Sequence, residues 1–154
     1  MIKPATESTT DNNISKWEKE IKSLLSKRES VEALRVALVA IAAADTGTAA
    51  TTTTPCEQRQ RAKENNAKII RNIIASFPSN GRNAKEAISQ LSTIECDVLM
   101  KYLYRLLGNG SNSGGTMGAS MGNNNGVLFR WHSELVEKAG IGSIVRVITD
   151  SDGF

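Results

Sequence analysis

The sequence predicts an all-α fold built from about six to seven short helices. In most segments the apolar residues recur three and four positions apart, which places them on one side of a helix. Residues that favour helix caps and turns separate these segments. Aromatic residues make up only 5% of the chain, and aliphatic side chains supply most of the apolar content. A chain of 154 residues with this composition suits a single domain of helices packed through aliphatic stripes.

The N-terminal third predicts a tail, two helices and a loop. Residues 1–12 are polar and rich in Thr and Asn, so we expect a disordered tail before one helical domain over 13–149. The first helix is predicted from about Ile14 to Lys27. The second is predicted from Ser30, which can cap its first turn, to about Ala44. Residues 45–55 are predicted to form a flexible loop, because β-branched Thr and a proline disfavour helix there.

Three further helices are predicted in the middle of the chain. The longest runs from about Cys56 to Phe77. A short helix follows, with Asn83 placed to cap it. Ser92 and Glu95 have the spacing of a capping box, so they predict the start of the next helix. Gly108 is placed to end that helix.

The C-terminal third contains one ambiguous segment. Residues 108–126 are rich in Gly and Asn and predict a flexible loop before a helix from Val127 to Ala139. Residues 143–149 are rich in β-branched side chains, which favour a strand by propensity. No other segment offers a strand to pair with, so we predict a short buried helix instead. Residues 150–154 are expected to form a C-terminal tail.

The composition favours a soluble protein in a reducing compartment. The net charge is only +3, although the sequence pI is near 9.0, and basic and acidic residues are interleaved. The two cysteines, Cys56 and Cys96, are too few for the disulfide framework of a small secreted domain. Residues 1–13 contain no apolar signal-peptide core, and the longest apolar run, Ala37–Ala44, is too short to span a bilayer. We expect a cytoplasmic protein that does not bind a membrane.

No residue pattern predicts catalysis, a cofactor or a metal. His132 is the only histidine, and Ser133 beside it points ~100° away on a helix, where it is poorly placed to act as a nucleophile. Cys56, Cys96 and His132 lack the paired spacing of zinc ligands. The Gly-rich segment 108–126 lacks the lysine and the preceding strand of a phosphate-binding loop. We therefore expect no enzyme activity and interpret His132 as a structural or interface residue.

A basic run in the third predicted helix leaves one alternative open. Its members are Arg59, Arg61, Lys63, Lys68 and Arg71. Such residues could contact phosphates and make the chain a basic helical RNA-binding module. Acidic residues interrupt the run, and no aromatic side chain is interleaved for base stacking. A solvated helix face is the favoured interpretation, so no nucleic-acid partner is expected. A free-standing helical adaptor for peptide motifs is the other alternative.

Three blocks of sequence in the C-terminal half of the chain together form a specific pattern. The first is Cys96–Arg105, with its Leu-Met-Lys-Tyr core and second tyrosine. The second is Val127–His132, an apolar run that ends in Trp-His, and the third is Gly140–Thr149, with Gly-Ile-Gly-Ser-Ile-Val-Arg-Val. In this order the three blocks resemble the sixteen-kilodalton subunit, subunit five, of the actin-related protein 2/3 complex. The resemblance covers about residues 56–149.

This resemblance implies an irregular α-α superhelix without catalytic residues. It also implies a structural subunit of the complex, which contributes to actin nucleation and branched-filament assembly by holding scaffold subunits together. The implied partners are the four-type scaffold subunit, the β-propeller subunit and the second actin-related protein, with actin contacted indirectly. The implied location is the cytoplasm and its cytoskeleton. Residues 1–20 lack the family's acidic N-terminal motif, which leaves the tethering of that actin-related protein open.

Residues of the matched blocks divide into candidate core and candidate interface positions. Leu99, Leu103, Leu128 and Trp131 fit inward stripes, whereas Tyr and Arg side chains off those stripes are of the kind that anchor interfaces. For Val145 and Val147 two roles stay open, closing the core or facing a partner. The candidate interface residues are Lys101, Tyr104, Arg105, Arg130, His132, Val145, Arg146 and Val147.

Overall fold

The computed structural model describes residues 8–48, 56–78, 81–111 and 122–149. These residues form seven helices and no strand, so the predicted all-α class is confirmed. Residues 143–149 are helical, as predicted, but the predicted burial of this helix is wrong, because only Ser143 and Val147 of it are buried. The helices are α1 (Ser8–Ser26), α2 (Ser30–Thr48), α3 (Cys56–Ser76), α4 (Gly81–Ser89), α5 (Thr93–Ser111), α6 (Gly122–Ala139) and α7 (Ile141–Thr149).

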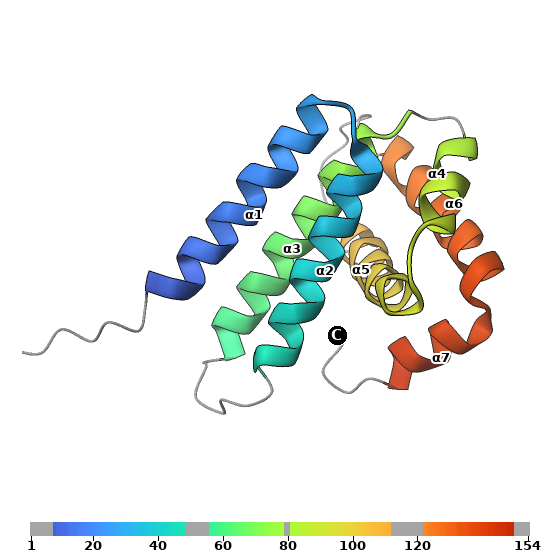
Figure 1. Cartoon of the computed structure of the whole chain (residues 1–154). Coiled ribbons are helices and arrows are strands. Elements are labelled where there is room, and N and C mark those ends of the chain that lie inside the picture. The colour runs from blue at the N-terminus through green and yellow to red at the C-terminus, as the bar shows by residue number, and fades with distance from the viewer. Residues whose placement is uncertain (1–7, 49–55, 79–80, 112–121, 150–154) are drawn as a thin grey trace, which may run out of the picture.

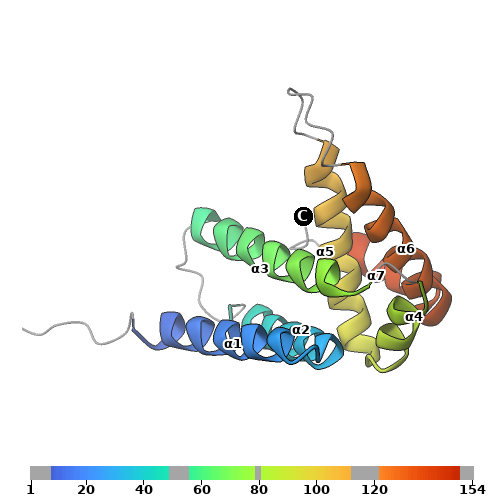
Figure 2. The same ribbon diagram turned by 90° about the horizontal axis from the view of Figure 1, so that it is seen from above.

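Helix α5 lies at the centre of the fold. Helices α1, α2 and α3 lie side by side, and α5 crosses them steeply, with α4, α6 and α7 on its other side (Figures 1 and 2). Helix α5 packs against α2, α3, α6 and α7. Its buried apolar residues, listed in order, are Cys96, Leu99, Met100, Tyr102, Leu103 and Leu106. A helix buried on so many sides ties the two groups of helices into one hydrophobic core.

The predicted inward stripes are confirmed around Trp131. Leu99, Leu103, Leu128 and Trp131 are all buried in the core. The ring of Phe77, at the end of α3, meets the indole of Trp131 edge-on with centroids 5.0 Å apart. Such edge-to-face pairs are favourable beyond the area that they bury. This contact joins α6 to the first group of helices.

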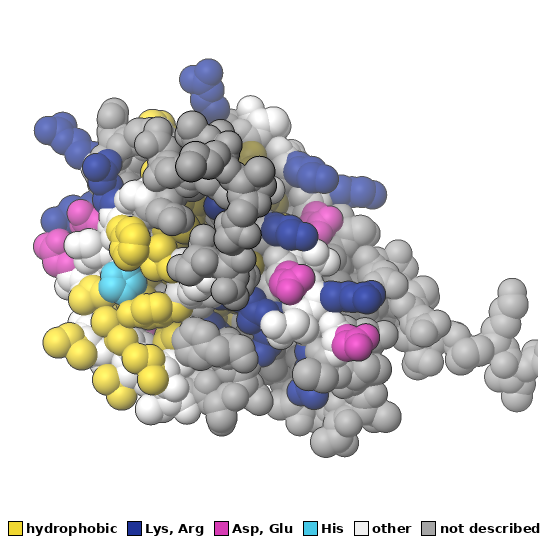
Figure 3. Space-filling model, turned by 180° about the vertical axis from the view of Figure 1, so that it is seen from behind, with side chains coloured by type: hydrophobic (Ala, Val, Ile, Leu, Met, Phe, Trp, Pro, Cys, Tyr) yellow, Lys and Arg dark blue, Asp and Glu magenta, His cyan; other side chains and the backbone are white. Residues whose placement is uncertain are grey.

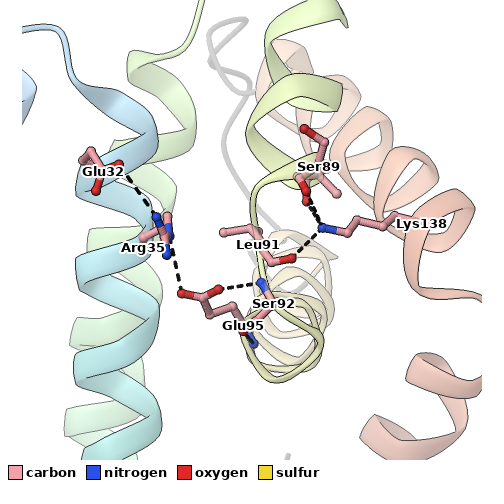
Figure 4. A network of polar contacts seen from close by, with 8 residues as sticks. Glu32, Arg35, Ser89, Leu91, Ser92, Glu95 and Lys138 are labelled. Carbon is pink, nitrogen blue, oxygen red and sulfur yellow. Dashed lines mark hydrogen bonds and ion pairs between the residues drawn. The ribbon is translucent and has the colours of Figure 1, made fainter.

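The capping box that begins α5 is formed as predicted. The backbone N–H of Ser92 donates to Oε2 of Glu95 at 2.6 Å, and the N–H of Glu95 donates to the Ser92 hydroxyl at 3.3 Å (Figure 4). Glu95 is buried, and its second carboxylate oxygen lies 3.8 Å from Nε of Arg35 in α2. The start of the central helix is therefore tied to α2 as well as to its own first turn.

Two tight turns have different residues in the left-handed region. Gly140, with φ 74°, separates α6 from α7, and its N–H bonds to the carbonyl of Val136 at 2.9 Å. Arg28, with φ 63°, occupies the same position after α1. There the N–H of Glu29 bonds to the Leu24 carbonyl at 3.0 Å, which completes a Schellman motif. The turn at Arg28 is the strained one, because a left-handed conformation costs roughly 1–2 kcal/mol for a residue with a Cβ.

Several predicted boundaries are wrong because the helices run further than their buried stripes. Helix α1 begins at Ser8, so residues 8–12 are helical where a disordered tail was predicted. Helix α2 continues to Thr48 into the predicted loop, and α5 passes Gly108 to reach Ser111. Elongation adds one backbone hydrogen bond per residue, which offsets the roughly 1 kcal/mol cost of one glycine.

The other helix starts also shift, and parts of the predicted loops and tails are not described. Helix α4 begins at Gly81, so Asn83 lies inside the helix and is not its cap. Helix α6 begins at Gly122 instead of Val127. The remaining parts of the predicted tails and loops, residues 1–7, 49–55, 112–121 and 150–154, lie outside the described residues.

Candidate protein–protein interface

Helix α7 divides its apolar residues between the core and the surface. Ser143 and Val147 are buried, and Val147 is only 4% exposed. Ile141, Val145 and Ile148 are 72%, 52% and 63% exposed. Their spacing of four and three residues puts these three on one side of the helix. The question left open by the sequence is thus answered differently for the two valines: Val147 closes the core and is not available to a partner, whereas Val145 is exposed.

Helix α6 extends this apolar surface through Phe129. Phe129 is 60% exposed, and His132 lies one turn further along the same side of the helix. Figure 3 shows hydrophobic side chains gathered around the histidine on one face of the molecule. We call this surface the apolar face and define it by the exposed apolar side chains of two adjacent helices, which are Phe129 of α6 and Ile141, Val145 and Ile148 of α7.

Tyr104 and His132 form a pair beneath this surface. The phenol oxygen of Tyr104 lies 3.0 Å from Nε2 of His132. The two rings meet edge-on, with centroids 5.2 Å apart and planes at 81°. Both residues are half-buried and come from different helices, α5 and α6. The contact fixes the orientation of the imidazole within the apolar face.

An ion pair holds α7 against α5. Nε of Arg146 donates to Oδ2 of Asp97 at 2.8 Å, and a second guanidinium nitrogen donates to Oδ1 at 2.9 Å. This is the two-point geometry that arginine and carboxylate groups favour. The hydrogen bond to Asp97 raises the pKa of Arg146. Arg146, a predicted interface residue, is thus engaged within the chain, and its role here is to position the helix that carries Val145.

The other predicted interface residues do not all join the apolar face. Lys101 and Arg105 lie on α5 one turn apart, and both are half-buried. Nε of Arg105 is buried and has no hydrogen-bond partner among the described residues. Arg130 is exposed but lies two residues from His132, which places it about 200° around α6. Of the predicted set, the structure brings Tyr104 and His132 into contact and leaves Val145 exposed on α7.

The basic residues of α3 do not form one surface. Arg59 and Arg61 are exposed, and so is Lys68. Arg59 and Lys63 lie on one side of the helix, whereas Arg61 and Lys68 lie nearly opposite, by the helical spacing of ~100° per residue. Glu57 and Glu64 are also exposed on this helix, so negative charges interrupt the basic residues. The arrangement lacks the continuous basic stripe that is typical of phosphate-backbone recognition.

The described residues contain neither a group of metal-binding side chains nor a helix that could span a membrane. No three His, Cys, Asp or Glu side chains in the described part of the chain are grouped so that they could hold a metal ion. None of the described helices is long and apolar enough to cross a membrane.

The sequence reasoning missed three members of the apolar face, Phe129, Ile141 and Ile148. Phe129 is an apolar residue off the buried stripe of its helix, and this departure from the stripe could have revealed it. Ile141 and Ile148 share the helical spacing of Val145, but Ile141 lay outside the predicted helix of 143–149. The true start of α7 was therefore the missing information for Ile141, whereas for Ile148 it was which side of the helix faces outward.

The fold and this surface define a class of protein, an all-α protein with an exposed apolar face of the kind that mediates protein–protein association. The family model described as "ARP2/3 complex 16 kDa subunit (p16-Arc)" matches residues 1–153. The chain belongs to this family. The match reaches well beyond the three blocks by which the sequence resembles it.

Individual relatives agree with this family. The chain is 32% identical over 88 residues to "Actin-related protein 2/3 complex subunit 5" of Dictyostelium discoideum. The matched region covers 57% of this chain and 54% of that protein. It is 32% identical over 92 residues to subunit 5-C of Xenopus laevis, covering 60% and 53% of the two chains. A probable subunit 5 of Caenorhabditis elegans is 32% identical over 91 residues, covering 59% and 55%. Each match spans about half the length of the relative.

Proposed function

We propose that this chain is a structural subunit of the actin-related protein 2/3 complex. It contributes to actin nucleation and to the assembly of branched filaments by holding scaffold subunits together, and it performs no catalysis of its own. The proposal places the chain in the cytoplasm, at the actin cytoskeleton. Family membership over residues 1–153 supports the assembly, and the apolar face supports a positional role in it.

The observation that carries the proposal is the exposure of four large apolar side chains on two adjacent helices. Fully burying one such side chain contributes roughly 1.5–3 kcal/mol. A permanent subunit interface usually buries well over ~1,000 Å² in total, so the apolar face would form its centre and polar residues its rim. Arg146 and Asp97 hold α7 in place before any partner binds, which lowers the ordering cost of association.

The partners that we propose are neighbouring subunits of the same complex. The subunit-four-type scaffold and the β-propeller subunit are the candidates for the apolar face, and the second actin-related protein is a candidate for the N-terminal segment. Contact with actin would be indirect. Arg105, which is half-buried on α5, is a candidate for the polar rim, because its guanidinium group could donate to a partner's carbonyl or carboxylate oxygen.

Affinity purification of the tagged chain from its own cytosol, followed by mass spectrometry, tests the proposal. We expect two actin-related proteins and a β-propeller subunit in near-equal amounts. Val145→Asp should abolish this co-purification, because it places a charge within the apolar face. Val39→Asp is the matched control, since Val39 is 57% exposed and lies on α2, which is in the group of helices on the other side of α5 from α6 (Figure 2).

Two outcomes would contradict the proposal. If the wild-type chain came down alone or with unrelated proteins, membership of the assembly would fail. If both aspartate variants lost their partners while remaining folded by circular dichroism, the loss would not be specific to the apolar face, and that face would not be the interface.

A further inference from the structure

We infer that Nδ1 of His132 makes a directional polar contact within the apolar face, donating a hydrogen bond to an acceptor oxygen on the subunit that covers it. This inference rests on the proposed function and adds a condition that the covering subunit must meet. The acceptor is a backbone carbonyl or a carboxylate or amide oxygen, presented among apolar side chains.

The two ring nitrogens of His132 have different surroundings. Nε2 is occupied by the phenol oxygen of Tyr104 at 3.0 Å. Nδ1 bonds to none of the described residues. Among the described residues, the side-chain nitrogen that is fully buried and has no partner is Nε of Arg105, and Nδ1 of His132 is not such an atom. Nδ1 of the half-buried His132 is therefore still accessible to solvent. Water satisfies it in the free chain.

The contact with Tyr104 selects the tautomer. A phenol hydroxyl both donates and accepts, and it is a stronger acid than the N–H of a neutral imidazole, so it donates to the bare nitrogen. Which ring nitrogen carries the proton is set by the bond that the other one makes. With Tyr104 O–H donating to Nε2, the proton of neutral His132 lies on Nδ1. The edge-on contact of the two rings keeps this geometry in place.

Covering the apolar face would remove the water from Nδ1. A buried N–H without an acceptor costs the desolvation energy of the group, whereas one that finds an acceptor recovers it. A purely apolar surface of the same shape would therefore bind less well than one that carries a matching oxygen. In this way His132 gives directional selectivity to a contact that is otherwise hydrophobic and non-directional.

A pair of substitutions separates the two nitrogens. The amide nitrogen of an asparagine can occupy the place of Nδ1, and the amide of a glutamine can occupy the place of Nε2. We would measure the affinity of His132→Asn and His132→Gln for the purified complex that lacks this subunit. His132→Asn should bind within about threefold of the wild type, whereas His132→Gln should bind roughly tenfold or more weakly, because only the first keeps a donor at Nδ1.

The wild type and Val145→Asp distinguish failure of this inference from failure of the proposed function. If the wild type did not bind the complex, the proposed function itself would be wrong. If the wild type bound, Val145→Asp did not, and the two His132 variants bound equally, the interface would stand and the role of Nδ1 would be overturned.

A measurement on the free chain tests the tautomer without any partner. With ¹⁵N-labelled histidine, the ring nitrogens of neutral His132 give distinct chemical shifts for protonated and bare nitrogen. We expect Nδ1 to be the protonated one and Tyr104→Phe to change this distribution. Protonation at Nε2 in the wild type would overturn the assignment of Nδ1 as the donor.

Discussion

The ammonium group of Lys138 lies 2.6 Å from the carbonyl oxygen of Ile88, so a side chain of α6 closes the C-terminal end of α4. The same group donates to the carbonyls of Ser89 at 2.8 Å and Leu91 at 2.5 Å (Figure 4). The last carbonyls of a helix have no partner within it, and a positive charge there also complements the helix dipole. One lysine thus satisfies three oxygens and joins two helices.

Replacing this lysine should destabilise the fold. Lys138→Met is expected to lower the free energy of unfolding by about 1–3 kcal/mol, because the carbonyls lose a charged donor. The measurement is urea denaturation followed by circular dichroism. Lys85→Met is the control, since Lys85 makes only an exposed ion pair with Glu137 at 3.4 Å, and such pairs contribute ~0–1 kcal/mol. Equal stability of both variants would show that the three contacts contribute nothing.

The capping box of α5 should be sensitive to the loss of its carboxylate. Glu95→Ala is expected to cost roughly 1–2 kcal/mol, because the backbone N–H of Ser92 loses its acceptor. Glu95→Gln retains an acceptor oxygen and should cost less. Thermal unfolding of the two variants compares them directly. A larger loss for glutamine than for alanine would mean that the contact with Ser92 is not what stabilises this helix start.

The two valines of α7 should respond in opposite ways. Val147→Ala removes buried methyl groups and is expected to cost about 1–3 kcal/mol of stability. Val145→Ala changes an exposed position and should stay within about 0.5 kcal/mol of the wild type. Denaturant titration of the isolated chain gives both values. If Val145→Ala were the more destabilising of the two, the described orientation of α7 would be wrong.

Arg28 offers a stabilising substitution. Its φ of 63° is strained for a residue with a Cβ, so Arg28→Gly should raise the free energy of unfolding by roughly 0.5–1 kcal/mol. The gain is smaller than the strain because glycine loses more backbone entropy on folding. Gly140→Ala, at φ 74°, is the reciprocal test and should destabilise the fold by a comparable amount. A loss of stability in Arg28→Gly would contradict this account of the turn.

Cys96 should be unreactive in the native chain. Burial raises the pKa of its thiol, so little thiolate forms at neutral pH. Iodoacetamide should label Cys96 slowly until the chain unfolds, as peptide mass spectrometry can follow. The raised pKa of Cys96 also makes the stability of the fold depend on pH. Below the unfolded thiol's pKa of ~8.5 both states keep the proton, and above it the unfolded thiol ionises first, so stability falls as pH rises. Rapid labelling of Cys96 in folded protein would contradict its burial.

The N-terminal boundaries show why pattern alone misplaces helix ends. The buried stripe of α1 suggested a start at Ile14, but α1 begins at Ser8. Periodicity reports which residues are buried, whereas a helix ends where its backbone hydrogen bonds end, and the two differ by a turn or more. The capping box at Ser92 and Glu95 was predicted correctly because both partners lie within one turn.

The sequence by itself determined the helical class, the inward stripes of α5 and α6, and the family to which the chain belongs. These depend on local spacing and on blocks of residues that the sequence shows directly. The tertiary structure alone decided which side of α7 is buried, that Tyr104 meets His132, and that Lys138 reaches the end of α4. A short helix that is apolar on both sides carries no periodic signature of its inward face. Contacts between residues 28 and 50 positions apart depend on how helices cross, which local spacing does not encode.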